Sequence, residues 1–296
     1  MLVVRAINSR GARIEQRHPS LTECPHAAPR CAGVRWCLLL VACSSSSAPP
    51  SVGSSSPVVD ARPRCPIGDA PERWVIDATP IAGEPCIDVV RFEGGLQVFS
   101  DASGRTADRW RDDEKLRAVI NAGMFHEGGA PVGLLIDRGR ALGDDNPKFG
   151  GFIAWDPVDA KAPPVIATAK QCAGFDLAAL RARYRSLIQS YRLLDCDGSA
   201  LAWQDPKQYS AAVLGVDRAG RIVMLHARGA VTMAELSKSL ATHDLAGAVF
   251  LEGGPEATLV AGTLSRVGSY ETGFVENDDN HVQWALPNVL GIVTRR

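Results

Sequence analysis

The stretch from Val119 to Gly139 reads VINAGMFHEGGAPVGLLIDRG, and a second stretch, from Phe250 to Leu259, reads FLEGGPEATL. Each begins with an apolar run typical of a buried strand and then breaks at glycines beside a carboxylate. Glycine lets the backbone approach a ligand closely, and a strand that ends in an acid presents a carboxyl group at the edge of a sheet. Two such strand ends can share one cleft. The bland alternative is a pair of structural turns with solvated acids.

The flanking sequence predicts a protein dominated by strands, with two helices. The predicted strands are Trp74–Asp77, Ile87–Phe92, Leu96–Phe99, Ala118–Asn121, Val132–Ile136, Gly151–Trp155, Ser190–Asp195, Ala211–Asp217, Ile222–Ala227, Ala248–Leu251 and Val289–Val293. One helix is predicted at Asp176–Tyr184, and a second after Thr232, which forms a capping box with Glu235. We expect an α+β (or α/β) fold: a single domain with a large mixed β-sheet flanked by a few helices.

Leu96–Phe99 is expected to follow a turn at Gly94-Gly95 and to pair with Ile87–Phe92 as a hairpin. Ala211–Asp217 and Ile222–Ala227 are expected to form a second hairpin across the turn that contains Gly220.

Composition and charge exclude two classes of protein. The chain has 296 residues, a formal net charge of −1 and 22% charged residues, which gives no electrostatic reason to bind nucleic acid. No segment is long and apolar enough to be read as a transmembrane helix.

The first 64 residues differ from the rest. Arg35 precedes an apolar run, WCLLLVAC, that ends at Cys43, and the segment SSSSAPPSVGSSSP follows. A basic residue, an apolar run and a small residue before cysteine outline a secretion signal, and LVAC resembles the bacterial lipobox, in which the cysteine is lipidated. We expect a leader at residues 1–43 with lipidation at Cys43, a flexible linker at residues 44–64 and the folded domain at residues 65–296. The alternative is a disordered tail with an accidental apolar patch.

Cysteine usage also favours a location outside the cytoplasm. Beyond Cys43 there are four cysteines, and an even number in an exported chain suggests two disulfides. Three pairings are open, and we favour Cys65–Cys86 with Cys172–Cys196 because each closes a modest loop. Free buried thiols are the alternative for a cytoplasmic protein. No cysteine spacing suggests zinc.

Several motifs, in order, resemble the phosphodiester glycosidase family. They are NAGMF at residues 121–125, PVG at residues 131–133, QS at residues 189–190 and EGG at residues 252–254. The resemblance covers roughly Ala118 to Leu259 and implies cleavage of a sugar from a phosphate at the anomeric carbon. Four departures stand out. Tyr191-Arg192 replace the family's Gly-Pro, Glu252 replaces its usual Asp, and Pro255-Glu256 replace its Gly-Ser. An arginine that often starts the following hairpin strand is missing.

The resemblance and the chemistry together nominate the site residues. A phosphodiester has a stable leaving anion, so the main need is a carboxylate that faces the oxocarbenium-like centre. Glu252 is the first choice for it, with Glu127 and Glu256 next, and His126 as a proton shuttle. Candidate substrate-binding residues are Asn121, Gly123, Gly133, Gln189, Ser190, Arg192, Gly253, Gly254, Asn277 and His281. For Arg192 two roles are equally open: phosphate binding in place of the missing arginine, or a solvated strand residue.

Asn277 and His281 belong to a dense run of acids and amides, residues 268–289, whose oxygens could bind a divalent cation, calcium or magnesium. The alternatives for this run are a sugar-stacking loop around Trp284 and a polar surface loop.

The expected function is hydrolysis of a sugar-1-phosphodiester in a phosphorylated sugar or polysaccharide. The protein is expected to be extracytoplasmic, either secreted or attached to a bacterial membrane through a lipid anchor only. The alternatives are a non-catalytic carbohydrate-binding envelope protein that retains the fold, and a structural envelope protein.

Overall fold

The computed structural model describes residues 65, 72–80, 83–269 and 278–294, which all lie in one compact unit, Arg62–Arg296. The leader, its Cys43 and the linker predicted at residues 44–64 lie outside the described residues. Within the described residues, no helix is long and apolar enough to span a membrane.

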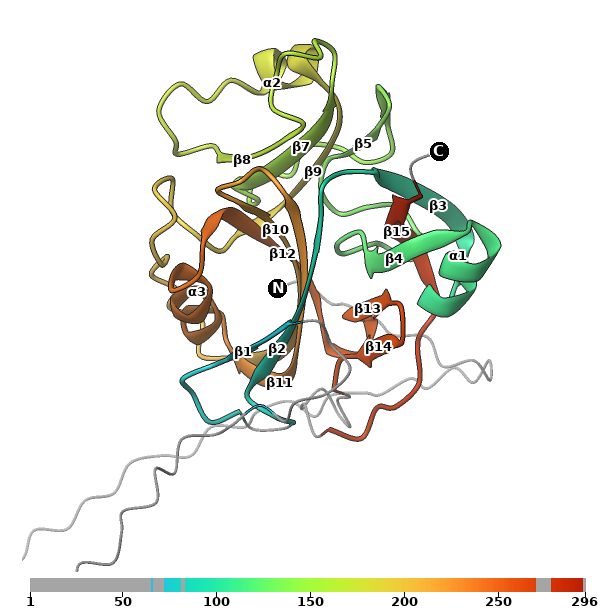
Figure 1. Cartoon of the computed structure of the whole chain (residues 1–296), viewed down its shortest axis with the longest axis vertical. Helices are drawn as coiled ribbons and strands as arrows, with labels where there is room; N and C mark the ends of the chain where they lie inside the picture. Colours follow the sequence, from blue (N-terminus) through green and yellow to red (C-terminus); the bar gives the residue numbers. More distant parts are fainter. Residues whose placement is uncertain (1–64, 66–71, 81–82, 270–277, 295–296) are drawn as a thin grey trace, which may run out of the picture. The chain divides into compact units, whose positions relative to one another are not determined.

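Most strands belong to one ten-stranded sheet (Figure 1). Its main path runs β1 (Glu72–Val75), β2 (Cys86–Phe92), β11 (Ile222–Thr232), β10 (Gln208–Asp217), β12 (Leu245–Gly253), β9 (Tyr184–Arg192), β5 (Leu135–Asp137) and β6 (Arg140–Ala141). A branch adds β7 (Gly151–Pro157), which pairs with β9, and β8 (Val165–Ala169), which pairs with β7.

A second, five-stranded sheet packs against the first. It runs β14 (Leu264–Val267), β13 (Thr258–Ala261), β4 (Leu116–Asn121), β15 (Leu286–Val293) and β3 (Leu96–Arg105). Residues of both sheets share one buried cluster, including Leu214 and Met224 from the first sheet and Ile120 and Leu290 from the second. Alternation of apolar side chains along each strand supplies this interior face.

Three α-helices complete the part of the unit that the structure describes. They are α1 (Ala107–Asp113), α2 (Leu177–Arg183) and α3 (Met233–Ala241). The predicted capping box of α3 is confirmed: the Thr232 hydroxyl accepts from the Glu235 amide, and the Glu235 carboxylate accepts from the Thr232 amide. Leu236 and Leu240 then pack α3 onto the first sheet, on the side away from the second sheet (Figure 1).

The α+β class and the large sheet are confirmed, but the arrangement of the strands differs from the prediction. The β-structure forms two sheets, and every strand pairing among the described residues is antiparallel. The predicted hairpin at Gly94-Gly95 is wrong, because β2 pairs with β11 in the first sheet and β3 pairs with β15 in the second. Gly95, with φ of 84°, lies where the chain passes from β2 in the first sheet to β3 in the second. The Val293 amide donates to the Gly95 carbonyl oxygen at 2.9 Å. The Gly220 hairpin of β10 and β11 is confirmed.

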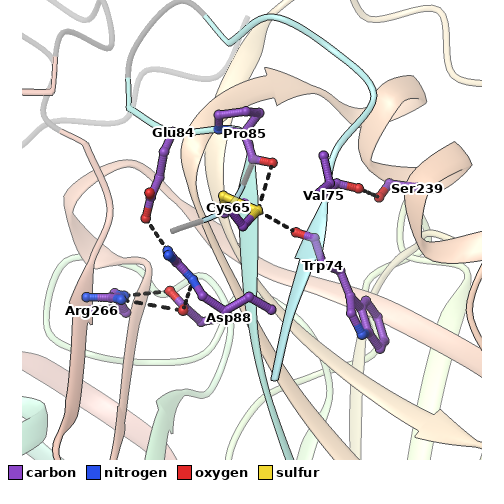
Figure 2. Close-up of a disulfide and its surroundings, with 10 residues drawn as sticks. Cys65, Trp74, Val75, Glu84, Pro85, Asp88, Ser239 and Arg266 are labelled. Atoms are coloured by element: carbon purple, nitrogen blue, oxygen red, sulfur yellow. Dashed lines mark hydrogen bonds and ion pairs between the residues drawn. A yellow bond between two sulfur atoms is a disulfide. The ribbon is translucent and has the colours of Figure 1, made fainter. Parts of the chain in front are cut away.

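Both favoured disulfides are present, Cys65–Cys86 and Cys172–Cys196. The first holds Cys65 beside β1 and β2, next to a group of buried charges (Figure 2). There the Asp88 carboxylate accepts from Arg73 Nε at 2.8 Å and from Arg266 Nε at 2.5 Å, and Arg73 also pairs with Glu84. This group ties the first sheet, through Asp88 of β2, to Arg266 of β14 in the second sheet.

Candidate active site

The two glycine-containing stretches meet where β4 and β12 end. The chain leaves β12 at Gly253, makes one 3₁₀ turn, η1 (Gly254–Glu256), and enters β13, which pairs antiparallel with β4. The Thr258 amide donates to Asn121 Oδ1 at 3.3 Å, and a Cβ atom at Gly123 would lie 3.8 Å from the carbonyl oxygen of Leu251. The pairing of β13 with β4 therefore brings the residues after Asn121 beside the residues after Leu251.

Glu252 and Glu256 form a pair of carboxyl groups at this junction, and both are half-buried. Burial raises the pKa of the Glu252 carboxyl to about 8, with the Glu256 carboxylate raising it further and the Gly253 amide, which donates to Glu252 Oε1 at 3.0 Å, opposing the shift. At neutral pH Glu252 is therefore protonated. A carboxyl group whose pKa is raised by burial and by a neighbouring carboxylate is typical of general acids in enzymes.

Glycine is required at two of the predicted positions because the backbone is crowded. A Cβ atom at Gly253 would lie 2.9 Å from the carbonyl oxygen of Ser210, and one at Gly133 would lie 2.7 Å from the carbonyl oxygen of Gln189. Gly254 has φ of 62°, which disfavours other residues. At Gly133 and Gly253, then, the structure shows close packing of the protein on itself.

Gln189 and Ser190 are candidate ligand-binding residues whose side chains the structure uses internally. Gln189 Oε1 accepts from the amides of Leu134 and Asn146 at 3.0 and 2.9 Å, and its Nε2 donates to the carbonyl oxygens of Asn146 and Phe149 at 2.8 and 3.0 Å. The Ser190 hydroxyl donates to the Phe250 carbonyl oxygen. Both residues are buried and their side chains bond within the protein, so their role in binding a ligand stays a prediction.

Asn121 is also buried, and its Oδ1 holds the Thr258 amide. Its Nδ2 has no partner among the described residues, and neither does the adjacent Thr258 hydroxyl. Asn121 thus fastens the two stretches to each other while keeping one unused donor.

His126 and Glu127 occupy the tip of a tight turn and are exposed. The His126 amide donates to the Ala130 carbonyl oxygen at 2.8 Å, and Asn288 of β15 donates to the Gly129 carbonyl oxygen at 2.6 Å, which holds the turn over the second sheet. Within the described part of the chain, neither side chain makes a hydrogen bond or ion pair. The structure therefore does not bring His126 or Glu127 into contact with Glu252, because the glycines fold the turn toward β15.

Arg192 lies three positions along the strand from Glu252, since its register partner on β12 is Val249. Its guanidinium pairs with Asp195 at 2.9 Å and lies 3.5 Å from Cys196 Sγ. The predicted role of Arg192 in binding phosphate therefore stays a prediction, and it would require the guanidinium to leave Asp195.

The segment before β15 is only partly described. Asn277, together with the acids Glu271 and Glu276, lies outside the described residues, and His281 is exposed. Asn280 is buried and donates to the Gly268 carbonyl oxygen at 3.0 Å, which ties this segment to the end of β14. The described residues contain no group of three or more His, Cys, Asp or Glu side chains that could hold a metal ion, so calcium or magnesium stays a prediction.

Two hollows lie away from the carboxyl pair. One, of about 800 Å³, is lined by Arg91, Arg111 and Arg117, and the other, of about 310 Å³, is lined by Arg192 and the Cys172–Cys196 disulfide. Neither includes Glu252 or Glu256, so the site is identified by its chemistry and not by the size of a cavity.

The sequence interpretation missed His226, which is fully buried behind η1 and lies 3.1 Å from the Ala257 carbonyl oxygen through Nε2. The only sequence signal for it is a histidine inside an apolar strand, which is more often a structural residue.

Comparisons with known proteins agree with these motifs. The family model for phosphodiester glycosidase matches residues 114–293. No curated protein sequence matches the chain. Among solved structures, the chain is similar to the catalytic domain of zebrafish N-acetylglucosamine-1-phosphodiester α-N-acetylglucosaminidase, auto-inhibited by its pro-peptide. That match has 15% identity and a TM-score of 0.53 over 76% of this chain and 88% of the other. It is also similar to a hypothetical protein from Synechocystis, with 14% identity and a TM-score of 0.48 over 70% of this chain and 58% of the other.

Proposed function

The chain belongs to the phosphodiester glycosidase family, and we propose that it hydrolyses a sugar-1-phosphodiester bond in a phosphorylated sugar, glycan or glycoconjugate outside the cytoplasm. The observation that carries the proposal is the half-buried Glu252–Glu256 pair, in which Glu252 belongs to the family's acid-Gly-Gly motif at the end of β12 and Glu256 lies in η1. Two disulfides among the described residues support the extracytoplasmic setting.

The raised pKa changes the role that we give Glu252. The sequence interpretation made it the carboxylate that faces the sugar, but an acid with a pKa of about 8 holds a proton at neutral pH. A neutral acid can donate a hydrogen bond to an anionic phosphate, whereas a carboxylate would repel it. We therefore assign Glu252 to the phosphate side as the acid, and Glu256 to the sugar side as the carboxylate.

In the proposed reaction, a water oxygen attacks the anomeric carbon while the bond from that carbon to the phosphate oxygen breaks. The phosphomonoester leaves with the bonding electron pair, Glu252 gives its proton to the leaving oxygen, and Glu256 accepts a proton from the attacking water. The products are the free sugar and a phosphomonoester, and exchange with solvent restores both carboxyl groups.

The test is hydrolysis of a panel of sugar-1-phosphodiesters, including UDP-N-acetylglucosamine, by the full chain. Wild type is compared with Glu252→Gln and with a matched control, Glu127→Gln, which alters an exposed acid at a turn tip. Each reaction is run with EDTA, calcium or magnesium, which tests the predicted cation. We expect sugar release by wild type and Glu127→Gln and a loss of at least about 100-fold in Glu252→Gln. Equal activity in all three proteins would remove Glu252 from the mechanism.

One observation favours a second candidate, a carbohydrate-binding protein without turnover. The side chains of Gln189 and Ser190 are used internally and Arg192 is paired with Asp195, so few predicted ligand contacts remain. Saturable binding of the same panel by folded wild type, with no product on any substrate, would favour this candidate.

A further inference from the structure

His226 lies in a lateral row of residues that crosses the first sheet to Glu252. On β11 it stands opposite Asp88 of β2 on one side and Ala212 of β10 on the other, and Ala212 stands opposite Glu252 of β12. Directly opposed residues of antiparallel strands point to the same face of a sheet. Asp88, His226 and Glu252 therefore share the face that packs toward the second sheet.

The imidazole contacts the backbone that carries Glu256. His226 Nε2 lies 3.1 Å from the Ala257 carbonyl oxygen, and because a carbonyl only accepts, Nε2 carries the hydrogen. The same oxygen accepts from the Gly268 amide at 2.7 Å, and the Ala257 amide donates to Gly254 at 3.1 Å. The turn of residues 254–257 is thus held from the β14 side by Gly268 and from the β11 side by His226.

The surroundings of His226 keep the ring neutral and in one tautomer. Burial lowers the pKa of His226 to about 4, the charges of Arg266 and Arg228 lower it further, and the Ala257 carbonyl and Asp88 oppose the shift. Asp88 is held by Arg73 and Arg266 and makes no hydrogen bond with the ring, so Nδ1 has no partner among the described residues. Above about pH 4 the ring is a neutral donor, and its one hydrogen-bond partner among the described residues is the Ala257 carbonyl oxygen.

We propose that His226 is a positioning residue: by donating Nε2–H to the Ala257 carbonyl oxygen, it fixes the 254–257 turn and so sets the spacing of the Glu252 and Glu256 carboxyl groups. The inference deepens the proposed function, because it concerns the acid that the reaction would use. Its physical basis is that both burial of Glu252 and its repulsion by Glu256 depend on where this turn lies. Glu256 is the charged group that acts on Glu252 in this way.

The test compares His226→Gln with His226→Asn in the full chain. Glutamine keeps an amide N–H near the position of Nε2, whereas asparagine is too short to reach Ala257 and fills a similar part of the site. The measurement is an NMR titration of the Glu252 side-chain carboxyl in protein labelled with ¹³C at glutamate, with the resonance assigned by its absence in Glu252→Gln. This readout does not depend on turnover, so it stands even if hydrolysis is not found.

We expect His226→Gln to leave the Glu252 titration unchanged. We expect His226→Asn to lower the midpoint of the Glu252 titration by about 1 pH unit. Glu256→Gln serves as the reference for a direct loss of the like charge. A wild-type midpoint in His226→Asn would overturn the proposal. An equal drop in both variants would also overturn it, because the shape of the imidazole and not its hydrogen bond would then be responsible.

Discussion

The raised pKa of Glu252 makes the free energy of unfolding fall as the pH rises. Its pKa is about 8 in the folded protein and 4.5 for an ordinary glutamate, so the folded protein keeps a proton that the unfolded chain releases. The stability linked to this group is complete below pH about 4.5, declines as the pH rises and is lost above about 8. Half-burial beside another carboxylate is the cause, and it is also what makes the group an acid at neutral pH.

Glu252→Gln is therefore expected to stabilise the protein in the neutral range. The free energy of unfolding of the variant, relative to wild type, should rise by on the order of 1–3 kcal/mol between pH 4.5 and pH 8, since glutamine loses no proton on unfolding. Urea unfolding at several pH values measures this difference, with Glu127→Gln as the control that should show no such trend. A pH-independent difference would contradict the raised pKa.

Glu256→Gln removes the proposed base, so kcat/KM should fall at every pH, and the alkaline limb of the remaining activity tests the coupling of the two carboxyl groups. If Glu252 acts as the acid, kcat/KM falls as the pH rises through about 8, because the free enzyme then loses the required proton. Removing the Glu256 charge lowers the pKa of Glu252. The alkaline limb of the pH dependence of kcat/KM should therefore move by about 1 pH unit toward lower pH. The pH–rate profile of wild type and variant decides this, and an unmoved limb would separate Glu256 from the titration of Glu252.

At the residue scale, the disulfide pairing predicted from the sequence is confirmed, whereas the catalytic roles of Glu252, from the acid-Gly-Gly motif, and of the nearby Glu256 stay predictions. The protonation of the two carboxyl groups could not be predicted from a motif, because it depends on burial and on the distance between two side chains across a turn. In the sequence, His126 and Glu127 are equally plausible as catalytic residues, yet their turn folds over the second sheet. His226 gave no usable signal, since its partner Ala257 is distant along the chain.

At the scale of elements, the Gln189 side chain of β9 holds the loop between β6 and β7 through hydrogen bonds. Its amide accepts two backbone N–H groups and donates to two carbonyl oxygens and to Asp145 at 2.6 Å. A buried amide with every donor and acceptor used rigidifies the segments it joins. Gln189 of the Gln-Ser motif thus supports the loop beside β9.

Gln189→Ala should destabilise the protein by about 2–4 kcal/mol, because buried backbone groups of Leu134, Asn146 and Phe149 would lose their partners. The matched control is Gln204→Ala, at an exposed position with little expected effect. Urea midpoints at constant slope measure both variants. Similar urea midpoints for the two variants would mean that water replaces the hydrogen bonds of the Gln189 side chain.

Predictions of elements succeeded where local signals were complete. The capping box located α3, and two apolar runs on either side of the Gly220 turn located β10 and β11. The first helix, α1, was missed because ADRWRDD has one turn's worth of apolar contact, namely Ala107 and Trp110, and little periodicity. The Gly94-Gly95 error has another cause: a glycine pair marks a change of direction, but whether the next strand returns to the same sheet depends on pairing with distant strands, here β11 and β15.

At the scale of the whole unit, long-range pairing decides the architecture. β15, near the end of the chain, pairs with both β3 and β4, and β11 pairs with β2. The site depends on this arrangement, because β13 and β4 join their motifs only once the second sheet has formed. No local pattern could have revealed that the strands separate into two sheets.

The two disulfides close loops of similar length, 21 and 24 residues, so loop entropy predicts about 3 kcal/mol of stabilisation from each. Their surroundings differ. Cys86 is buried and begins β2, and its bond holds the chain that leads to the edge strand β1, whereas Cys196 is exposed in a turn. Loss of the first bond should also loosen Arg73 on β1, and with it the charge group around Asp88 that joins the two sheets.

We therefore expect the Cys65→Ala/Cys86→Ala pair to lose more stability than the Cys172→Ala/Cys196→Ala pair, by about 1–2 kcal/mol beyond the shared entropic effect. Urea unfolding of both double variants without reductant measures the two losses, and wild type with reductant gives their combined effect. Equal losses would show that the Asp88 group holds β1 and β2 without the bond. A larger loss in the Cys172→Ala/Cys196→Ala pair would instead make the exposed turn, and not the edge strand, the part of the fold that most needs a covalent link.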